Sequence, residues 1–288
     1  MLRDLAKRAY QLAQKRLPPT LSAAITFARA HHRLPAIRPK TFSDYVFHRK
    51  VADDDPRFEV YADKLRVKEI VADAVGSEWV IPTLWHGDSV PEQIFQWPLP
   101  FVLKANHGSG FNLFLRSRSD LDLDAISAAV EIWSKHQWPR WMGEAWYNRI
   151  PKRLLAEPMI GDGSGVSDFK LFTFGGRVEF IQVDLDRFIS HKRVFFDPEW
   201  RRHNFSLKYP SDPRPIQKPP FLREMIEAAS LLGAPFTFAR VDLYETAQGP
   251  RFGEITFTPG AGLERFTPRS MDLQFGRLWS EAERKKRC

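Results

Sequence analysis

Four polar side chains near the end of the chain have the types and spacing of a metal and phosphate site. They lie in two β-branched, aromatic runs, "FTFARVDLYE" and "RFGEITFT", which the turn "TAQGP" joins. Centring that turn on Gln248 makes antiparallel partners of Asp242 and Glu254. The same register pairs Arg240 with Thr256, on the same face because strand side chains alternate. Opposed carboxylates repel unless a cation separates them, and Mg²⁺ prefers oxygen ligands. The hairpin predicts either an Mg²⁺ site beside an arginine that faces negative charge, or an exposed face with ordinary charges.

A glycine-rich turn earlier in the chain could hold an anion. In "FVLKANHGSGFN" a strand ends near Lys104, and the run of Gly108, Ser109 and Gly110 leads into the next strand. Glycines let backbone N–H groups turn toward an anion, the serine adds a donor, and Lys104 can reach a phosphate. The spacing differs from that of a P-loop, and the turn joins two strands instead of opening a helix. The alternative is a hairpin turn that binds nothing.

Two other segments have side chains that could contact a substrate. The stretch "DLDRFISHKR" contains Arg187, His191, Lys192 and Arg193, which could bind a carboxylate or a uronic acid. A solvated basic loop is the alternative. The segment "WPRWMGEAW" contains three of the nine tryptophans, which could stack on sugars or pack in the core.

The composition is that of a folded protein from a reducing compartment. The chain has 288 residues, of which 43% are hydrophobic and 13% aromatic, unlike a disordered chain. Its one cysteine, Cys288, supports neither a disulfide framework nor a cysteine metal site. Residues 1–50 carry eleven bases and two acids, so this segment is +9 and the rest of the chain is −1. Because the basic excess is confined there and no nucleic-acid-binding signature is present, nucleic-acid binding is a rival class that we do not favour.

The basic excess coincides with an expected helix at residues 2–17. Its apolar residues recur at helical spacing with bases on the other face, so it could lie on anionic lipid, bind a partner or pack on its own domain. Prolines in "RLPPT" and "RLPAIRPKTF" predict an irregular connection to about residue 45. We find no signal peptide and expect a cytoplasmic protein, with peripheral contact at the inner membrane face as an option.

The pattern of the remaining chain predicts mostly hairpins and a few helices. Helices are expected over 61–76, 121–136 and 221–233, with Gly76 and Gly233 as stops. Strands are expected over 99–105, 112–119 and 153–160, where Pro158 demotes the strand to an edge or ends it. Hairpins are expected over 168–187, turning at Gly175–Gly176, and over 236–258. Because hairpins outnumber strand–helix–strand units, we predict an α+β fold with antiparallel sheets.

The order of these motifs resembles the ATP-grasp superfamily, and most of all its TupA-like ATP-grasp family, named after a teichuronopeptide-synthesis protein. The resemblance runs from about residue 40 to about 275. It rests on Asp63–Lys64 opening a helix and on the segments "FVLKANHGSG", "LLAEPMI", "DFKLFTFGGRVEFIQVDLDR", "DPEW", "RVDLY" and "FGEITFTPGAG". It implies two α+β lobes that grip a nucleotide.

The resemblance also implies roles for individual residues. Lys64 and Lys104 match lysines that contact phosphate, and Asp242 and Glu254 match Mg²⁺ ligands. Arg240 and Lys104 are the implied catalytic residues. Thr256 stands where many related ligases have an asparagine as a further metal ligand. The other implied nucleotide contacts are a loop over the phosphates (His107, Gly108, Ser109, Gly110), a segment that reads adenine (Glu157, Met159, Ile160), and the pair Asp168 and Lys170.

We therefore expect three parts: a basic helical and irregular segment (1–60), a lobe with the phosphate loop (61–156) and a lobe with the Mg²⁺ site (157–288). The resemblance implies an ATP- and Mg²⁺-dependent ligase that joins a carboxylate to an amine through an acyl-phosphate, acting on a cell-surface polysaccharide or its precursor. One alternative is a kinase of the same fold that phosphorylates a hydroxyl. The alternative of another class is a nucleic-acid- or membrane-binding protein without catalysis.

Overall fold

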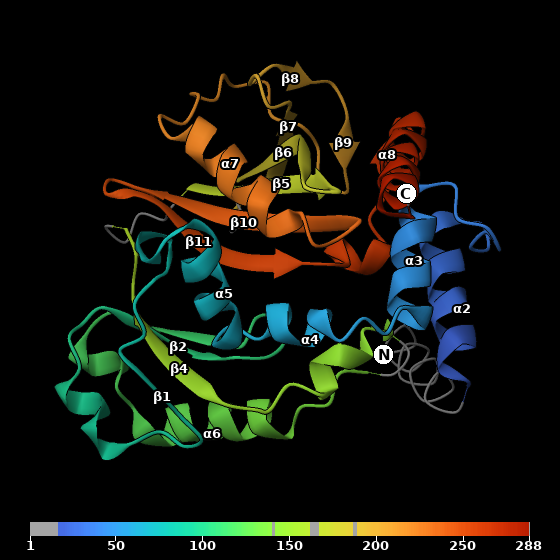
Figure 1. The fold of residues 1–288 in the computed structure, drawn as a ribbon. Helices are drawn as coiled ribbons and strands as arrows, with labels where there is room; N and C mark the ends of the chain where they lie inside the picture. Colours follow the sequence, from blue (N-terminus) through green and yellow to red (C-terminus); the bar gives the residue numbers. More distant parts are fainter. Residues whose placement is uncertain (1–16, 140–141, 162–166, 187–188, 288) are drawn as a thin grey trace.

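The structure is a computed structural model that describes residues 17–139, 142–161, 167–186 and 189–287. Two antiparallel sheets lie one above the other, with α6 below the small sheet and α7 against the large one (Figure 1). The predicted α+β class with antiparallel sheets is confirmed. The expected helix over residues 2–17 lies almost entirely outside the described residues.

The large sheet has the strand order β11-β10-β5-β6-β7-β8, and every neighbouring pair is antiparallel. Its strands are β5 (Ser167–Phe174), β6 (Arg177–Leu185), β7 (Lys192–Phe196), β8 (Arg202–His203), β10 (Phe238–Thr246) and β11 (Gly249–Thr256). The two predicted pairs are confirmed, since Asp242 pairs with Glu254 and Arg240 with Thr256. The predicted turn centre is not, because the turn pairs Thr246 with Gly249 and a register shift between Asp242 and Leu243 brings Asp242 opposite Glu254. The turn at Gly175–Gly176 is confirmed as well.

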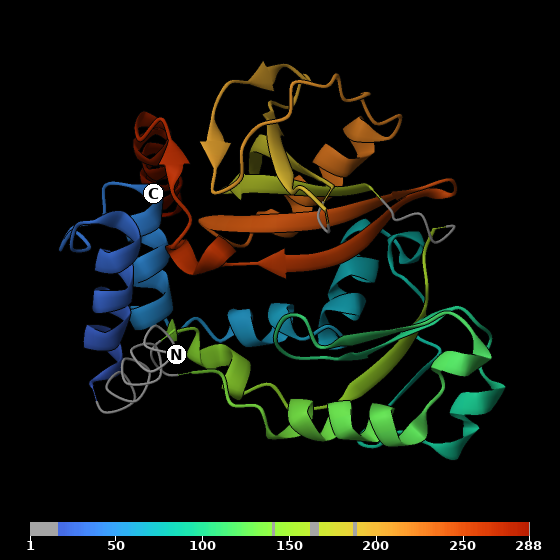
Figure 2. The same ribbon diagram turned by 180° about the vertical axis from the view of Figure 1, so that it is seen from behind.

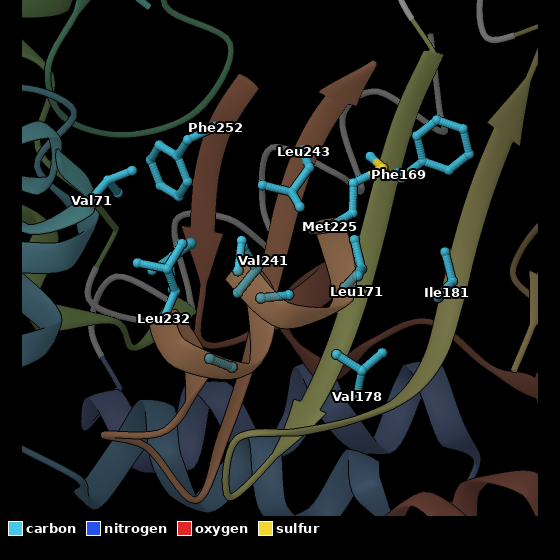
Figure 3. Packing of buried hydrophobic residues seen from close by; sticks show 14 of the residues in the cluster. Val71, Phe169, Leu171, Val178, Ile181, Met225, Leu232, Val241, Leu243 and Phe252 are labelled. Carbon is cyan, nitrogen blue, oxygen red and sulfur yellow. The ribbon is translucent and has the colours of Figure 1, made fainter. Parts of the chain in front are cut away.

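One face of the large sheet is apolar throughout and is covered by helices. Alternating side chains of β5, β6 and β10, including Leu171, Ile181 and Val241, pack under α7 (Leu222–Gly233) and beside α5 (Arg66–Val75) in one buried cluster (Figure 3). The helical spacing of Met225 and Leu232 turns both side chains toward these strands. Each such side chain contributes about 1.5–3 kcal/mol by its burial.

The opposite face of the large sheet is apolar over only half its length. Its aromatic half packs against α3 (Phe42–Ala52) and α8 (Ser270–Arg287), which lie side by side with α2 (Pro19–His31) at one end of the molecule (Figures 1 and 2). In this cluster the rings of Phe180 and Phe275 stack at 4.2 Å. The other half of the face carries charged side chains and faces the small sheet.

The small sheet has the order β1-β4-β2-β3 and is also antiparallel. Its strands are β1 (Trp85–Gly87), β2 (Phe101–Ala105), β3 (Asn112–Leu115) and β4 (Leu154–Pro158). Phe101 and Leu103 pack against Trp133 of α6 (Leu123–Lys135), so one face of this sheet is covered by that helix. Alternation turns Lys104 and Glu157 to the other face, toward the large sheet. Pro158 ends β4, which is an inner strand and not an edge.

The irregular connection expected to about residue 45 is confirmed for residues 32–41 and wrong on either side of them, where α2 and α3 form. Pro19 stands in the first turn of α2, where no backbone N–H is required. Thr41 and Asp44 form a capping box that begins α3. The helix expected over 61–76 is confirmed from residue 66 to its predicted stop at Gly76, but its first residues are wrong. It is divided into α4 (Arg57–Ala62) and α5, since the Asp63 side chain accepts hydrogen bonds from the N–H groups of Leu65 and Arg66.

The division of the chain at residues 60 and 156 stays a prediction. In the structure β4 spans residue 156, and α5 packs with the large sheet although it precedes the small sheet in sequence. The long helix α8 was not expected from the sequence. Within the described residues, no helix combines the length and the hydropathy needed to cross a bilayer.

A buried arginine joins α3 to the large sheet. The Arg49 side chain, 5% exposed, donates hydrogen bonds to the carbonyls of Phe238 (2.7 Å) and Phe257 (3.3 Å) and to the hydroxyl of Thr237 (2.9 Å). Its guanidinium also lies 4.2 Å from the ring centroid of Trp279. Removing this side chain would leave two buried carbonyls without their donor.

We predict that Arg49→Ala lowers the free energy of unfolding by about 3 kcal/mol, because buried acceptors lose their partner and a packed side chain is deleted. Arg223→Ala is the matched control, since that side chain is 86% exposed on α7, and it should change stability by less than about 0.5 kcal/mol. Urea denaturation measures both. Equal stability of the two variants would show that Arg49 does not join these elements.

Candidate active site

The charged half of the large sheet and the inner face of the small sheet enclose a cavity of about 530 Å³. The register places Glu254, Asp242, Lys170 and Gln182 in one row across β11, β10, β5 and β6. Three members of this row line the cavity, and Gln182 is buried beside it. Successive side chains of a strand point to opposite faces of the sheet. The same strands therefore place their apolar residues in the core and the residues of this row on the floor of the cavity.

Arg240 and Asp242 form a bidentate ion pair at the centre of this floor. Arg240 Nε and Nη2 lie 2.7 and 2.6 Å from the two carboxylate oxygens of Asp242, and Nη2 also donates to Thr256 Oγ1 at 3.1 Å. Burial raises the pKa of the Asp242 carboxyl to about 6, against the opposing charges of Arg240 and Lys170. Burial alone would lower the pKa of Arg240, but the carboxylate of Asp242 raises it. Glu254 lies farther from the guanidinium, at 3.7 Å, and is 43% exposed.

The neighbouring strands continue the charged floor. Lys170 forms an ion pair with Asp168, and its ammonium lies 3.5 Å from Asp242. At the β6–β7 end, Arg193 donates to Asp184 (2.7 Å) and forms an ion pair with Glu264 (2.8 Å). The guanidinium of Arg193 is therefore shared between two carboxylates.

His191 lies at the same end of the cavity. Its Nε2 is 3.2 Å from Asp184 Oδ1, and its ring stacks on Tyr209 at 3.7 Å. Together with the ion pairs of Arg193, these contacts make the predicted basic cluster a mixed acidic and basic surface and not a patch of free positive charge. Its third predicted member, Arg187, lies outside the described residues.

Three lysines approach the cavity from the small-sheet side. Lys104 and Lys68 bind the two oxygens of Glu157 at 2.6 and 2.5 Å. Lys68 also donates to the carbonyl of Ile81 (2.8 Å) and to Thr83 Oγ1 (2.7 Å). Burial would raise the pKa of Glu157, but the charges of Lys104 and Lys68 lower it. Lys68 was not predicted from the sequence, although its spacing of four residues from Lys64 could have indicated it.

The glycine-rich loop is held by the third lysine. Lys64 Nζ donates to the carbonyl of Gly108 at 2.7 Å, and burial lowers the pKa of Lys64. Gly108 and Gly110 both have positive φ, 68° and 80°, a conformation that favours glycine. Ser109 and Gly110 line the cavity. The loop thus turns the carbonyl of Gly108 toward Lys64. An anion-binding turn presents N–H groups instead, so that role of the loop stays a prediction.

Three predicted nucleotide contacts lie away from both main cavities. His107 is 4% exposed, and its Nε2 lies 3.2 Å from the carbonyl of Trp133 in α6. Met159 and Ile160 follow β4 without lining a cavity, and the N–H of Met159 donates to the carbonyl of Pro100 at 3.0 Å. Their roles as nucleotide contacts stay predictions.

The two opposed carboxylates fit a magnesium ion that a phosphate helps to bind. Among the described residues, no group of three or more histidine, cysteine, aspartate or glutamate side chains is arranged to hold a metal. Mg²⁺ usually takes one or two carboxylates and completes its shell with water and phosphate oxygens. Asp242 and Glu254 supply that number. Thr256 lines a second cavity and accepts a bond from Arg240, so its role as a metal ligand stays a prediction.

The second cavity, of about 330 Å³, adjoins the first. The two share the wall residues Lys64, Ser109, Arg240, Gly253 and Glu254. Its remaining walls come from α4, β11 and the turn η6 (Pro259–Gly262), and from the side chains of Trp138, Met142, Glu144 and Tyr147. This cavity was not foreseen, because the segments that enclose it are far apart in the sequence.

Two antiparallel α+β lobes with a glycine-rich loop, convergent lysines and paired carboxylates between them define an ATP-grasp fold. The chain belongs to the TupA-like ATPgrasp family, whose model matches residues 45–280. This confirms the family and the fold predicted from the motifs. No curated protein sequence matched the chain.

Solved structures of ATP-grasp and amino-acid ligases are distantly similar to the chain. The ATP-grasp ligase PsnB, complexed with a phosphomimetic variant of its minimal precursor, Mg and ADP, has 14% identity and a TM-score of 0.43 over 70% of this chain and 52% of that one. D-alanine–D-alanine ligase from Bacillus anthracis has 14% identity and a TM-score of 0.41 over 68% and 56%. L-amino acid ligase from Bacillus licheniformis has 15% identity and a TM-score of 0.43 over 82% and 48%. The chain thus spans about half the length of these structures.

We predict that His107 makes the fold sensitive to acid. Burial lowers the pKa of its imidazole to about 4, from an ordinary value of 6.5. The unfolded chain therefore binds a proton there at a higher pH than the folded chain, so the free energy of unfolding falls as the pH falls from about 6.5 to about 4. Urea denaturation at several pH values should show a shallower decrease for His107→Gln. The exposed His86 of β1 supplies the control His86→Gln, which should follow the wild type, and equal slopes for all three proteins would contradict the assignment.

Proposed function

We propose that the chain is an ATP- and Mg²⁺-dependent ligase that activates a carboxylate as an acyl-phosphate and joins it to an amine. The main support is that Lys64, Lys68 and Lys104 converge on one side of the larger cavity while Asp242 and Glu254 oppose each other on the other side. Ammonium groups bind phosphate, and paired carboxylates with phosphate bind Mg²⁺. Membership of the TupA-like ATPgrasp family is the second support.

In this proposal the small sheet and its glycine-rich loop hold the nucleotide. Lys64, Lys104 and the backbone N–H groups of Ser109 and Gly110 bind phosphate oxygens. The apolar wall beside Ile81 contacts adenine, with polar groups of the segment that follows Glu157. When phosphate binds, the ion pair of Lys104 with Glu157 would weaken as Lys104 forms a hydrogen bond with the phosphate. Lys68 would remain ion-paired with Glu157.

Asp242 and Glu254 would hold Mg²⁺, which supplies positive charge to the phosphate oxygens when bound. The substrate carboxylate attacks the γ-phosphorus, the bond to the β–γ bridging oxygen breaks, and ADP leaves. The amine nitrogen then attacks the acyl carbon, the bond to the phosphate oxygen breaks, and inorganic phosphate leaves while the amine's surplus proton passes to solvent. Arg240 and Lys104 orient the reacting groups and offset the negative charge that develops.

The proposal extends to the setting in which the enzyme works. The acceptor or donor would be a cell-surface polysaccharide precursor, consistent with the association from which the family takes its name. The enzyme would act in the cytoplasm, with residues 1–17 as a possible contact to an anionic membrane surface. If deletion of residues 1–16 leaves liposome association unchanged, these residues do not contact the membrane surface.

We predict that Mg-ATP raises the melting temperature of the wild-type protein. Lys104→Met should weaken ATP binding about 10- to 100-fold, since a charge-assisted hydrogen bond is lost. The double variant Asp242→Asn/Glu254→Gln should lose the part of the shift that requires Mg²⁺. Lys135→Met is the control, because Lys135 is 74% exposed on α6. A wild-type protein without a shift, or with the same shift in the double variant, would refute the nucleotide site.

Product analysis separates the ligase from a kinase. A ligase releases ADP and inorganic phosphate in step with the joined product, whereas a kinase releases ADP and a phosphorylated acceptor. We expect stoichiometric inorganic phosphate in the presence of donor and acceptor. Transfer of the γ-phosphate to a hydroxyl that survives isolation would replace the ligase proposal with the kinase.

A further inference from the structure

The second cavity is placed to hold the group that reacts with the γ-phosphate. It lies directly against the first cavity, and the two have Lys64, Arg240 and Glu254 in their common wall. A ligand in the second cavity that extends toward this wall therefore meets the predicted phosphate and metal ligands. At about 330 Å³, the cavity lies at the lower end of the range for small-molecule sites.

The cavity has charge of opposite sign at different parts of its wall. Lys64 and Arg240 supply positive charge at the common wall, beside the predicted metal ligand Glu254, whereas Glu144 supplies a carboxylate elsewhere in the lining. Glu144 is 4% exposed, and burial raises the pKa of its carboxyl. Its oxygens accept hydrogen bonds from neutral donors, Trp138 Nε1 (2.8 Å) and Thr258 Oγ1. Both donors also line the cavity.

The backbone holds Glu144 in a disfavoured conformation. Its φ is 60°, in the left-handed region that residues with a Cβ rarely adopt. The N–H of Glu144 donates to the carbonyl of Lys50 at 2.9 Å, and the Lys50 ammonium donates to the carbonyl of Ala261 at 2.8 Å. A Cβ at the preceding Gly143 would lie 2.4 Å from the same Lys50 carbonyl. Such over-determined strain is typical of functional positions.

Aromatic side chains surround this acid. Tyr61, Trp138 and Tyr147 line the cavity, and the last two rings lie 4.7 Å apart. The faces of aromatic rings attract a cation, and a carboxylate beside them adds to that attraction. The same rings can also cover an apolar side chain of a ligand.

We propose that the second cavity binds an amino acid as the acyl donor, with its carboxylate toward Lys64 and Arg240 and its ammonium toward Glu144. The rings of Trp138 and Tyr147 flank the ammonium and the side chain. This inference rests on the proposed ligase function and adds the class of the donor. The donor carboxylate attacks the γ-phosphorus, ADP leaves, and an aminoacyl phosphate forms.

The first experiment uses wild-type protein, Mg-ATP and hydroxylamine. Hydroxylamine attacks the acyl carbon, the bond to the phosphate oxygen breaks, and a hydroxamate and inorganic phosphate form. The L- and D-amino acids are screened for hydroxamate, and the best one is compared with its deaminated acid and its decarboxylated amine. We expect the amino acid to exceed the deaminated acid at least tenfold and the amine to give none. Equal rates with the deaminated acid, or no hydroxamate from any amino acid, would overturn the proposal.

The second experiment tests the role of Glu144. Glu144→Gln should raise KM for the amino acid about 30-fold or more, because the ammonium loses its buried partner, while the Mg-ATP thermal shift stays unchanged. Glu227→Gln is the control, since Glu227 is a 59% exposed acid on α7. An unchanged KM in Glu144→Gln would overturn the assignment of the ammonium. If that variant does not fold, the comparison of amino acid and deaminated acid on wild-type protein decides alone.

The two proposals fail in different ways. Absence of a Mg-ATP thermal shift in the wild type refutes the nucleotide-dependent function. A shift without stimulation by any amino acid leaves that function intact and refutes only the donor class.

Discussion

The charged half-face of the large sheet cannot be covered by an apolar layer, and much of the fold is arranged around that constraint. One face of the sheet is apolar from end to end and lies under α7 and α5, while the other changes from aromatic to charged along the same strands. The helices α3 and α8 cover only the aromatic half. The small sheet lies over the charged half without packing into it, because buried charges need partners or water. The cavity follows from this change of composition.

The charged side chains of the cavity form ion pairs with one another, and a charged ligand can take the place of one partner in each pair. Asp242 is held by Arg240 and Lys170, and Glu157 by Lys68 and Lys104. Such pairs offset desolvation but contribute little net stability, because the cost of burying both ions is large. A bound phosphate can replace the carboxylates as the partner of the lysines and arginine, and a bound metal can replace these bases as the partner of the carboxylates. The desolvation cost of the buried charges then stays similar. The ion pairs therefore keep the site folded and ordered before a ligand arrives, and preorganisation of this kind favours binding.

The parts of the site that local pattern determines were predictable from sequence. Alternation and a turn placed at Gln248 led to the correct pair Asp242 and Glu254, although in the structure a register shift beside Asp242 produces that pair. The glycines correctly marked a turn that lines the cavity, and its binding of an anion stays a prediction. Helices α2 and α8 were missed because their apolar residues are buried by tertiary contacts, α2 against α3 and α8 against the large sheet, which a local pattern does not contain. Lys68 and Glu144 were missed for a related reason. From the sequence alone, Lys68 and Glu144 resemble ordinary solvated charges. Their partners, Glu157 for Lys68 and Thr258 for Glu144, are distant in sequence and come beside them only in the fold.

Two sets of residues line the second cavity: those in the wall that it shares with the first cavity, and those that line the second cavity alone. Lys64, Arg240 and Glu254 belong to motifs that the family resemblance already marks, and they face both cavities. The turn η6 in the outer wall of the second cavity ends the segment "FGEITFTPGAG" of the family resemblance, whereas Trp138, Glu144 and Tyr147 lie outside the segments that carry it. Changes at those three positions would alter the second ligand without moving the phosphate-binding groups. If the proposed donor site is correct, donor specificity varies within a fixed nucleotide site, and Glu144, held at a positive φ, is the position that binds the donor's ammonium.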